Sequence, residues 1–158
     1  MSYAIKSFSL AIILVFMISG CAKQPDKIAQ TKSGLPEVEI NTTDIDLVKS
    51  TIMDKIYSLG KGYYLVDESN NSLVFQKELT GFKADLAQAL TVGPRGERPK
   101  IEVKFTISKR KMNTVVYAHI FQIYKSGLGK VDRINGTSNN KNFNDLYNFL
   151  KSVKNMFL

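Results

Sequence analysis

Two segments of the chain place apolar residues at helical spacing, one near the start of the expected folded region and one at its end. From 44 to 59 the apolar residues recur every three or four positions, with Thr43 as an N-cap and Gly60 at the place of a left-handed C-cap. From Phe143 to Phe157 apolar residues repeat at the same intervals. Both patterns predict amphipathic helices that bury one face against a core.

Between these helices, apolar and polar residues alternate in the manner of strands. The clearest example is 101–108, where every second residue is apolar and the others are polar or charged. The other predicted strands are 63–66, 72–77 and 114–124; 93–100 and 125–142 are expected to be loops, and 80–91 a short helix or a loop. This order predicts an α+β two-layer sandwich, an antiparallel sheet of about four strands with amphipathic helices on one face.

The strand predicted over 114–124 is apolar on both faces, which is unusual when one face of a sheet is wet. One face carries Val115, Tyr117, Phe121 and Ile123, and the other carries Val116, Ala118 and Ile120. Two interpretations stay open. The second face lies under a loop or under the 80–91 segment, or it forms an apolar groove or patch for a partner or a lipid.

Composition limits the chain to one ordinary domain with appendages. It has 158 residues, of which 44% are apolar and 23% charged, close to the averages of soluble globular domains. A single Cys excludes an internal disulfide framework and multi-cysteine metal sites, and a single His leaves no cluster for a catalytic metal. We therefore expect no metal ion and no cofactor.

The first 21 residues have the pattern of an export signal that ends at a cysteine. Lys6 supplies a positive charge, and 10–18 is an unbroken apolar run of nine residues, too short for a membrane-spanning helix of about 20 residues. The tripeptide 18–20, Ile-Ser-Gly, stands directly before Cys21. This sequence resembles the lipobox of bacterial lipoproteins, with Ile in place of the usual Leu.

The resemblance implies that residues 1–20 are a signal peptide and that Cys21 carries a diacylglycerol and an N-acyl chain such as palmitate. Several chains matter because one chain gives only marginal membrane binding. Position 22 is Ala, and lipoproteins of enteric-type bacteria without Asp there tend to reach the outer membrane. We expect an outer-membrane lipoprotein with a flexible tether over 21–37 and a single α+β domain over 38–158 facing the periplasm. The alternative is an unmodified thiol behind an ordinary signal or membrane anchor.

The chain is basic, with 22 Lys and Arg against 14 Asp and Glu and a net charge of +8. Nucleic acid is not an expected partner for an exported protein, whereas acidic proteins, lipid phosphates and other anionic envelope polymers are. In a hairpin of 101–108 with 114–124, the flanking loops share one end of the sheet. That end gathers the predicted partner-binding residues Arg95, Arg98, Lys100, Lys125, Lys130 and Arg133, opposed by Glu97 and Asp132. A solvated rim without a partner is the alternative.

The pattern offers little for catalysis. His119 lies within the 114–124 strand among strand-face residues, and a general base needs an oriented nucleophile and usually a carboxylate behind it. The glycines around 93–96 and 127–129 lack the Gly-Lys-Ser/Thr ending of a phosphate loop. We therefore expect His119 to be structural and the protein not to be an enzyme.

The order of elements looks like the helix-grip arrangement of some periplasmic lipoprotein domains, including those of BamC, an accessory lipoprotein of the barrel-assembly machine. Together with the lipobox, this likeness suggests an accessory adaptor subunit of an outer-membrane apparatus for secretion, conjugation or barrel assembly. Such a subunit works through protein–protein contacts within an envelope complex. The alternative is a periplasmic module that binds a lipid or another amphiphile between helix and sheet.

Cys21→Ser removes the thiol that the expected acylation needs. Incorporation of labelled fatty acid into the protein should be lost, and the protein should be released or mislocalised. Metabolic labelling followed by membrane fractionation measures both effects. Fatty acid that is still incorporated after the substitution would contradict the lipobox interpretation.

Overall fold

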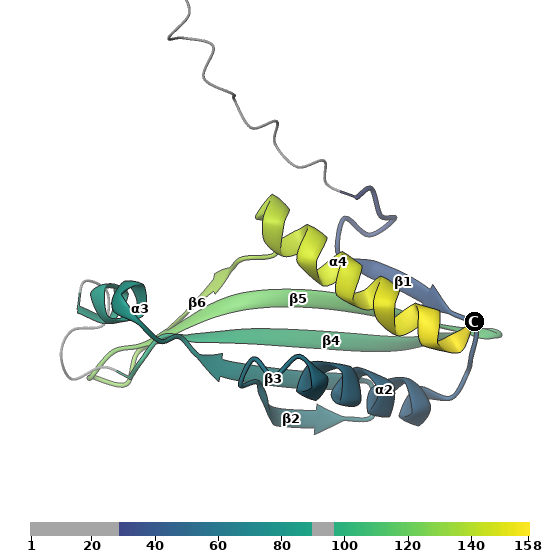
Figure 1. The fold of residues 1–158 in the computed structure, drawn as a ribbon, viewed down its shortest axis with the longest axis horizontal. Helices are drawn as coiled ribbons and strands as arrows, with labels where there is room; N and C mark the ends of the chain where they lie inside the picture. The colour runs from purple at the N-terminus through teal and green to yellow at the C-terminus, as the bar shows by residue number, and fades with distance from the viewer. Residues whose placement is uncertain (1–28, 90–96) are drawn as a thin grey trace, which may run out of the picture.

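Two long helices pack on one face of an antiparallel sheet in the computed structural model, which describes residues 29–89 and 97–158 (Figure 1). The strands are β1 (Glu37–Ile40), β2 (Tyr64–Ser69), β3 (Ser72–Glu78), β4 (Lys100–Arg110), β5 (Asn113–Lys125) and β6 (Val131–Asn135). The helices are α2 (Ile45–Ser58), the short α3 (Phe82–Ala87) and α4 (Asn140–Lys154), followed by a 3₁₀ turn, η2 (Asn155–Phe157). The α+β class predicted from the hydrophobic pattern is confirmed.

The hairpin of β4 and β5 forms the centre of the sheet, whose strand order is β1-β5-β4-β3-β2. β1 and β6 share the outer edge of β5, since β1 pairs with its residues 114–117 and β6 with its residues 121–125. Thr137 closes the gap between them, because its hydroxyl accepts a hydrogen bond from the Ile120 amide at 3.0 Å. The backbone of β5 therefore has partners along this whole edge.

The opposite edge of the sheet is β2, which is irregular. Its register with β3 shifts between Leu65 and Asp67, a β-bulge that takes Val66 out of the pairing. All residues of β2 except Leu65 are exposed. Glu68 forms an ion pair with Lys49 of α2 at 2.5 Å, which ties this edge to the helix layer.

The described sheet has six strands rather than about four, because the hydrophobic pattern does not reveal β1 and β6. β1 has only four residues and directly follows a segment rich in Gly and Pro. All five residues of β6 are exposed, so no apolar alternation marks this strand; backbone pairing with β5 and the contacts of Arg133 hold it. The stretch 125–142, predicted to be a loop, therefore contains β6 and the first turn of α4.

The helix starts are set by polar caps. α2 begins after Asp44 rather than after Thr43, because the Asp44 carboxylate accepts a hydrogen bond from the Leu47 amide at 2.9 Å. α4 begins three residues before Phe143, because the side chain of Asn139 accepts hydrogen bonds from two amides of its first turn. The first turn of α4 begins with three polar residues, so apolar periodicity does not mark its start.

The core lies between the inner face of the sheet and the two long helices. Phe105 of β4 is fully buried, and its ring centroid lies 5.5 Å from that of Phe149 in α4. Leu146 and Leu150 belong to the same cluster as Phe105 and Ile107. The apolar stripe of the C-terminal helix thus packs on the apolar side of the clearest strand, as the two patterns require.

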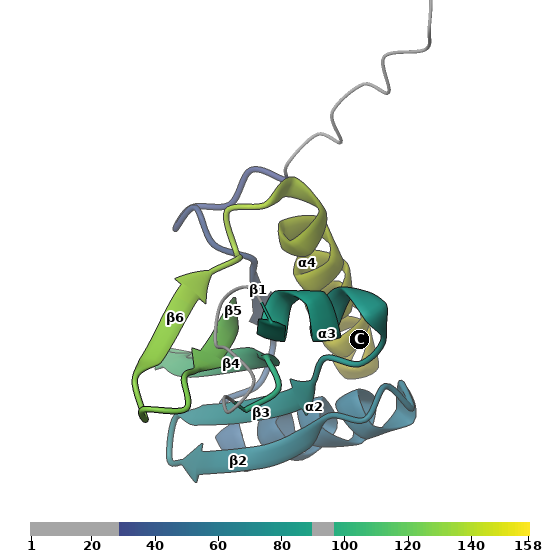
Figure 2. The same cartoon turned by 90° about the vertical axis from the view of Figure 1, so that its left-hand side faces the viewer.

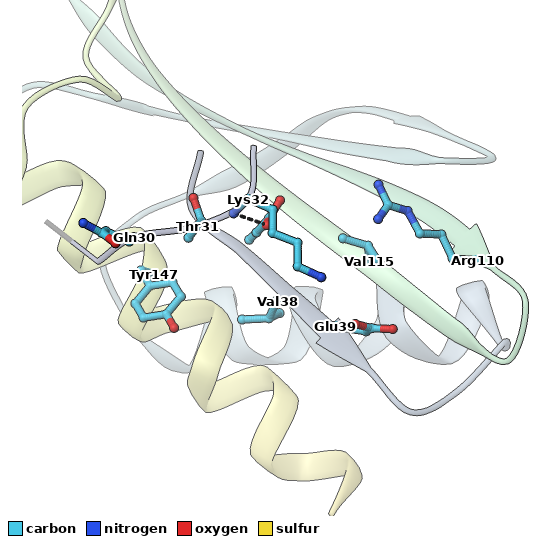
Figure 3. A pocket seen from close by; sticks show the side chains of 9 residues that line it. Gln30, Thr31, Lys32, Val38, Glu39, Arg110, Val115 and Tyr147 are labelled. Atoms are coloured by element: carbon cyan, nitrogen blue, oxygen red, sulfur yellow. Dashed lines mark hydrogen bonds between the residues drawn. The ribbon is translucent and has the colours of Figure 1, made fainter. Parts of the chain in front are cut away.

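The chain before β1 already belongs to the folded domain. Pro36 is buried, and its carbonyl accepts a backbone hydrogen bond from β5 at 2.9 Å. Residues 30–32 lie beside β1 and line a small pocket of about 220 Å³ together with Tyr147 of α4 (Figure 3). The predicted boundary between the tether (21–37) and the domain therefore moves back to about residue 30.

Several predictions fall outside the described residues. They concern the signal peptide over 1–20, the acylated Cys21, the first part of the tether and Arg95. A short helix or a loop is predicted over 80–91. The structure describes 80–89 of this stretch, which contains the short helix α3.

Leu150→Ala removes most of a fully buried side chain at the centre of the core. The free energy of unfolding should fall by about 2–5 kcal/mol, from the lost burial and the cavity left behind. Leu128→Ala is the matched control, because Leu128 is 99% exposed and its truncation should change stability by less than about 0.5 kcal/mol. Urea unfolding measures both. Equal stability of Leu150→Ala and wild type would show that the register of α4 on the sheet is wrong.

Candidate functional site

A cleft opens between α2 and α4 on the helix-covered side of the sheet. Figure 1 shows α4 crossing the strands obliquely, so that it moves away from α2 toward its own N-terminal end. The last turn of α2 and the first half of α4 form the two walls, and β4 lies between them as the floor. The cleft has a volume of about 380 Å³, and ligand pockets commonly measure about 300–1,000 Å³.

Apolar side chains form the floor and most of both walls: Ile56, Leu59, Ile101, Val103, Phe105, Ile120, Leu146 and Phe149. Val103 and Phe105 are buried core residues, whereas Leu59 is 40% exposed and Ile101 and Ile120 are only partly buried. The core therefore continues into the cleft, where part of its apolar surface stays accessible. Accessible apolar surface in a concave place is the usual sign of a ligand site.

Three lysines also line the cleft: Lys61, Lys77 and Lys141. Lys77 is the unusual one, because it pairs with Ile101 in the register and so lies on the helix-covered face of the sheet, in phase with Phe75. Its ammonium group lies 4.8 Å from the centroid of the Tyr63 ring, a cation–π contact. A lysine at this inward position follows two inward apolar residues, Leu73 and Phe75, and so departs from the pattern of a core-facing strand side.

Within residues 29–89 and 97–158, no carboxylate pairs with the lysines of the cleft. Among the described residues, none of the three forms an ion pair, and Asp145 is the only carboxylate in the described lining. Burial, and then the charge of Lys61, lower the pKa of Lys77 below its usual value. Burial raises the pKa of Tyr63, so its hydroxyl stays neutral and offers the cation no charge. An excess of positive charge therefore borders an apolar floor.

The basic end predicted from the loops is present but largely neutralised. The Glu97 amide donates to the Lys125 carbonyl at 3.0 Å, so the two loops do share one end of the sheet. Every described cation of the predicted set has a carboxylate partner: Arg98 with Asp85 at 3.8 Å, Lys100 with Glu97 at 3.4 Å, Lys125 with Glu97 at 2.6 Å, Lys130 with Asp132 at 3.2 Å, and Arg133 with Glu102. The hydrogen bond from Lys125 is the main cause that lowers the pKa of Glu97.

The sheet face opposite the helices carries the second apolar side of β5. Figure 2 shows α2 and α4 on the other side of the strands. His119 stacks on Phe121 with ring centroids 6.0 Å apart, and the Arg133 guanidinium lies 3.8 Å from the Phe121 centroid. Arg133 also pairs with Glu102, a buried carboxylate on the same face. Long polar side chains, rather than a helix, thus cover part of this face.

The alternative of an amphiphile between helix and sheet places a ligand in this region, but sequence reasoning missed the lysines that border the cleft. The cleft results from the angle between two helices, which no local pattern encodes. One signal was nevertheless present in the sequence: in β3 the inward positions read Leu73, Phe75 and Lys77, so a charge stands where an apolar residue is expected.

The chain matches no protein-family model, no curated protein and no solved structure. Within the described residues, no helix is both long enough and apolar enough to cross a bilayer. Over the same part of the chain, no group of three His, Cys, Asp or Glu side chains is placed to hold a metal ion.

His119 makes stability depend on pH. Burial, followed by the charges of Lys104 and Arg133, lowers its pKa, so the native state holds a neutral imidazole. The unfolded chain, with a histidine pKa of about 6.5, binds the proton more readily. The unfolded state therefore binds more protons as the pH falls through about 6.5, and the free energy of unfolding should decrease over that range. Above about pH 6.5 both the folded and the unfolded state hold a neutral His119, so its titration no longer lowers the free energy of unfolding.

His119→Gln removes this titration, so its stability should fall less than that of the wild type when the pH drops from about 7.5 to about 5.5. Urea unfolding of both proteins at several pH values gives the difference, in which the titrations of the carboxylates cancel. Parallel curves for the two proteins would contradict the assigned environment of His119.

Proposed function

We propose that this protein is a lipid-anchored envelope protein whose domain holds the chain of an amphiphile in the cleft between α2 and α4. The observation that carries the proposal is the cleft itself, in which an apolar floor continuous with the core stays partly accessible. Beside the floor stand lysines that form no ion pair with any described residue. A core that served stability alone would close this space, because accessible apolar surface and inward cations both cost free energy.

The anchor is part of the same proposal. Cys21, placed after the lipobox-like tripeptide, would attach the chain to a membrane through its acyl groups. Covalent geometry limits the distance from Cys21 to residue 29 to about 28 Å. Residue 29 lies beside Phe143 in the first turn of α4, the helix whose other side forms a wall of the cleft. An anchored domain would therefore keep the cleft near the bilayer that supplies the amphiphile.

The expected affinity depends on how much of an acyl chain the cleft removes from water. Each methylene transferred from water contributes about 0.8 kcal/mol, so a chain of about ten methylenes contributes about 8 kcal/mol before the losses from ordering. A dissociation constant of about 1 μM corresponds to about 8 kcal/mol. The losses from ordering make the expected binding of the amphiphile weaker than this value. Such binding allows the amphiphile to exchange with a membrane instead of staying in the cleft permanently.

The second candidate is an adaptor subunit of an outer-membrane apparatus for secretion, conjugation or barrel assembly. One observation favours it: the sheet face opposite the helices carries Tyr117, His119, Phe121 and Arg133, and aromatic residues and arginines are enriched at protein interfaces. The exposed Tyr64 lies on this same face, because it pairs with Gln76 and Gln76 pairs with Glu102.

Site-specific photocrosslinking in cells separates the two candidates. A photoreactive amino acid replaces Leu59 in the cleft at the C-cap of α2, Leu47 in the first turn of α2 outside the cleft, or Tyr64 on the open sheet face. Their exposed fractions are similar, 40%, 49% and 42%. After illumination, mass spectrometry of the purified protein should show a lipid-sized adduct for Leu59 and none for Leu47. A protein adduct at Tyr64 with no lipid adduct at Leu59 would favour the adaptor and reject the amphiphile-binding function.

A further inference from the structure

We infer that the cleft selects a single-chain amphiphile with an anionic head group, and that Lys77, with Lys61 and Lys141, holds that head group. This inference rests on the proposed function and adds the chemistry of the ligand. A chain lies on the apolar floor formed by β4, while a phosphate or carboxylate meets the ammonium groups beside it.

The position of Lys77 is the first argument. Its strand neighbour in the register is Ile101, and the next inward pair is Phe75 with Val103, so its side chain rises from the floor of the cleft rather than from its rim. Lys61 follows α2 and Lys141 lies in the first turn of α4, so the three cations come from three different elements around one opening. An anion placed there would contact ammonium groups from more than one side.

Charge complementarity is the second argument. Elsewhere in the described chain Lys49, Lys100 and Lys125 each pair with a carboxylate, whereas Lys141 forms no ion pair even with Asp145, one turn away on α4. Lys61, Lys77 and Lys141 form no ion pair with any described residue, and Asp145 is the one carboxylate in the described lining. An anionic head group would supply the missing charge, whereas a cationic one would be repelled.

The environment of Lys77 is the third argument. Burial and the charge of Lys61 both disfavour its ammonium form, and the ring of Tyr63 is its only described contact for the charge. Because Lys77 is only partly buried and forms no ion pair with a described residue, its charge adds little to stability, so Lys77→Met should leave the melting temperature unchanged or raise it. A clear fall in melting temperature would assign Lys77 a structural role and overturn the inference.

The test uses the full-length lipidated protein, with the photoreactive residue at position 59, in vesicles of phosphatidylcholine. Two probes with the same acyl chain are compared at equal amounts: lysophosphatidylglycerol, which is anionic, and monoacylglycerol, which is neutral. The anionic probe should give about tenfold more adduct at position 59, the effect of one charged hydrogen bond. In Lys77→Met this preference should fall severalfold.

Lys151→Met is the matched control. Lys151 also lies over a tyrosine ring, 5.7 Å from the Tyr147 centroid, but it is exposed and stands outside the lining of the cleft. It should keep the full preference for the anionic probe. An excess of glycerol phosphate, which has the head group but no chain, should leave the adduct yield unchanged; strong competition would reject an amphiphile in favour of a free phosphate compound.

The outcomes separate this inference from the function on which it rests. Adducts at position 59 from neither probe would reject the amphiphile-binding function. Equal adducts from both probes would keep that function and reject the selection of an anionic head group. A preference for the anionic probe that survives Lys77→Met unchanged would reject the assignment to Lys77.

Discussion

The pairing of β4 with β5 is the interaction on which the rest of the structure depends. It runs without interruption from Lys100 opposite Ile123 to Arg110 opposite Asn113, and every strand except β2 pairs with one of these two. The inner side chains of the hairpin form both the core and the floor of the cleft, and the outer ones carry the stack of His119, Phe121 and Arg133. One long hairpin thus supports two surfaces of different chemistry.

Long elements that bury one face could be predicted from the sequence, whereas the four-residue β1 and the exposed β6 could not. α2, α4, β4 and β5 each hide one side, so their periodicity is visible in the residues. β6 hides no side chain, and its pairing with β5 leaves no trace in the pattern. The ion pairs show the same limit, since Asp85 and Glu102 reach Arg98 and Arg133 from elements far away in the sequence.

The cleft belongs to a third category, because it is a property of packing between elements. The sequence predicts two amphipathic helices and their apolar stripes, but the angle at which they cross the sheet depends on how side chains interlock. Where the helices diverge, β4 is left partly uncovered, and Lys77 can point inward there and still reach water. The divergence of the helices therefore leaves Ile101 only partly buried and also keeps the ammonium group of Lys77 in contact with water.

The bulge in β2 has a consequence for how copies of this protein behave beside one another. A regular, unpaired edge strand is a template on which another chain can add, and crowding makes such addition more frequent. In β2 the register shift between Leu65 and Asp67 interrupts the row of amides and carbonyls, and the exposed carboxylate of Asp67 disfavours pairing with a second copy of the same edge. Molecules concentrated on a surface could thus lie close together without joining their sheets into an aggregate.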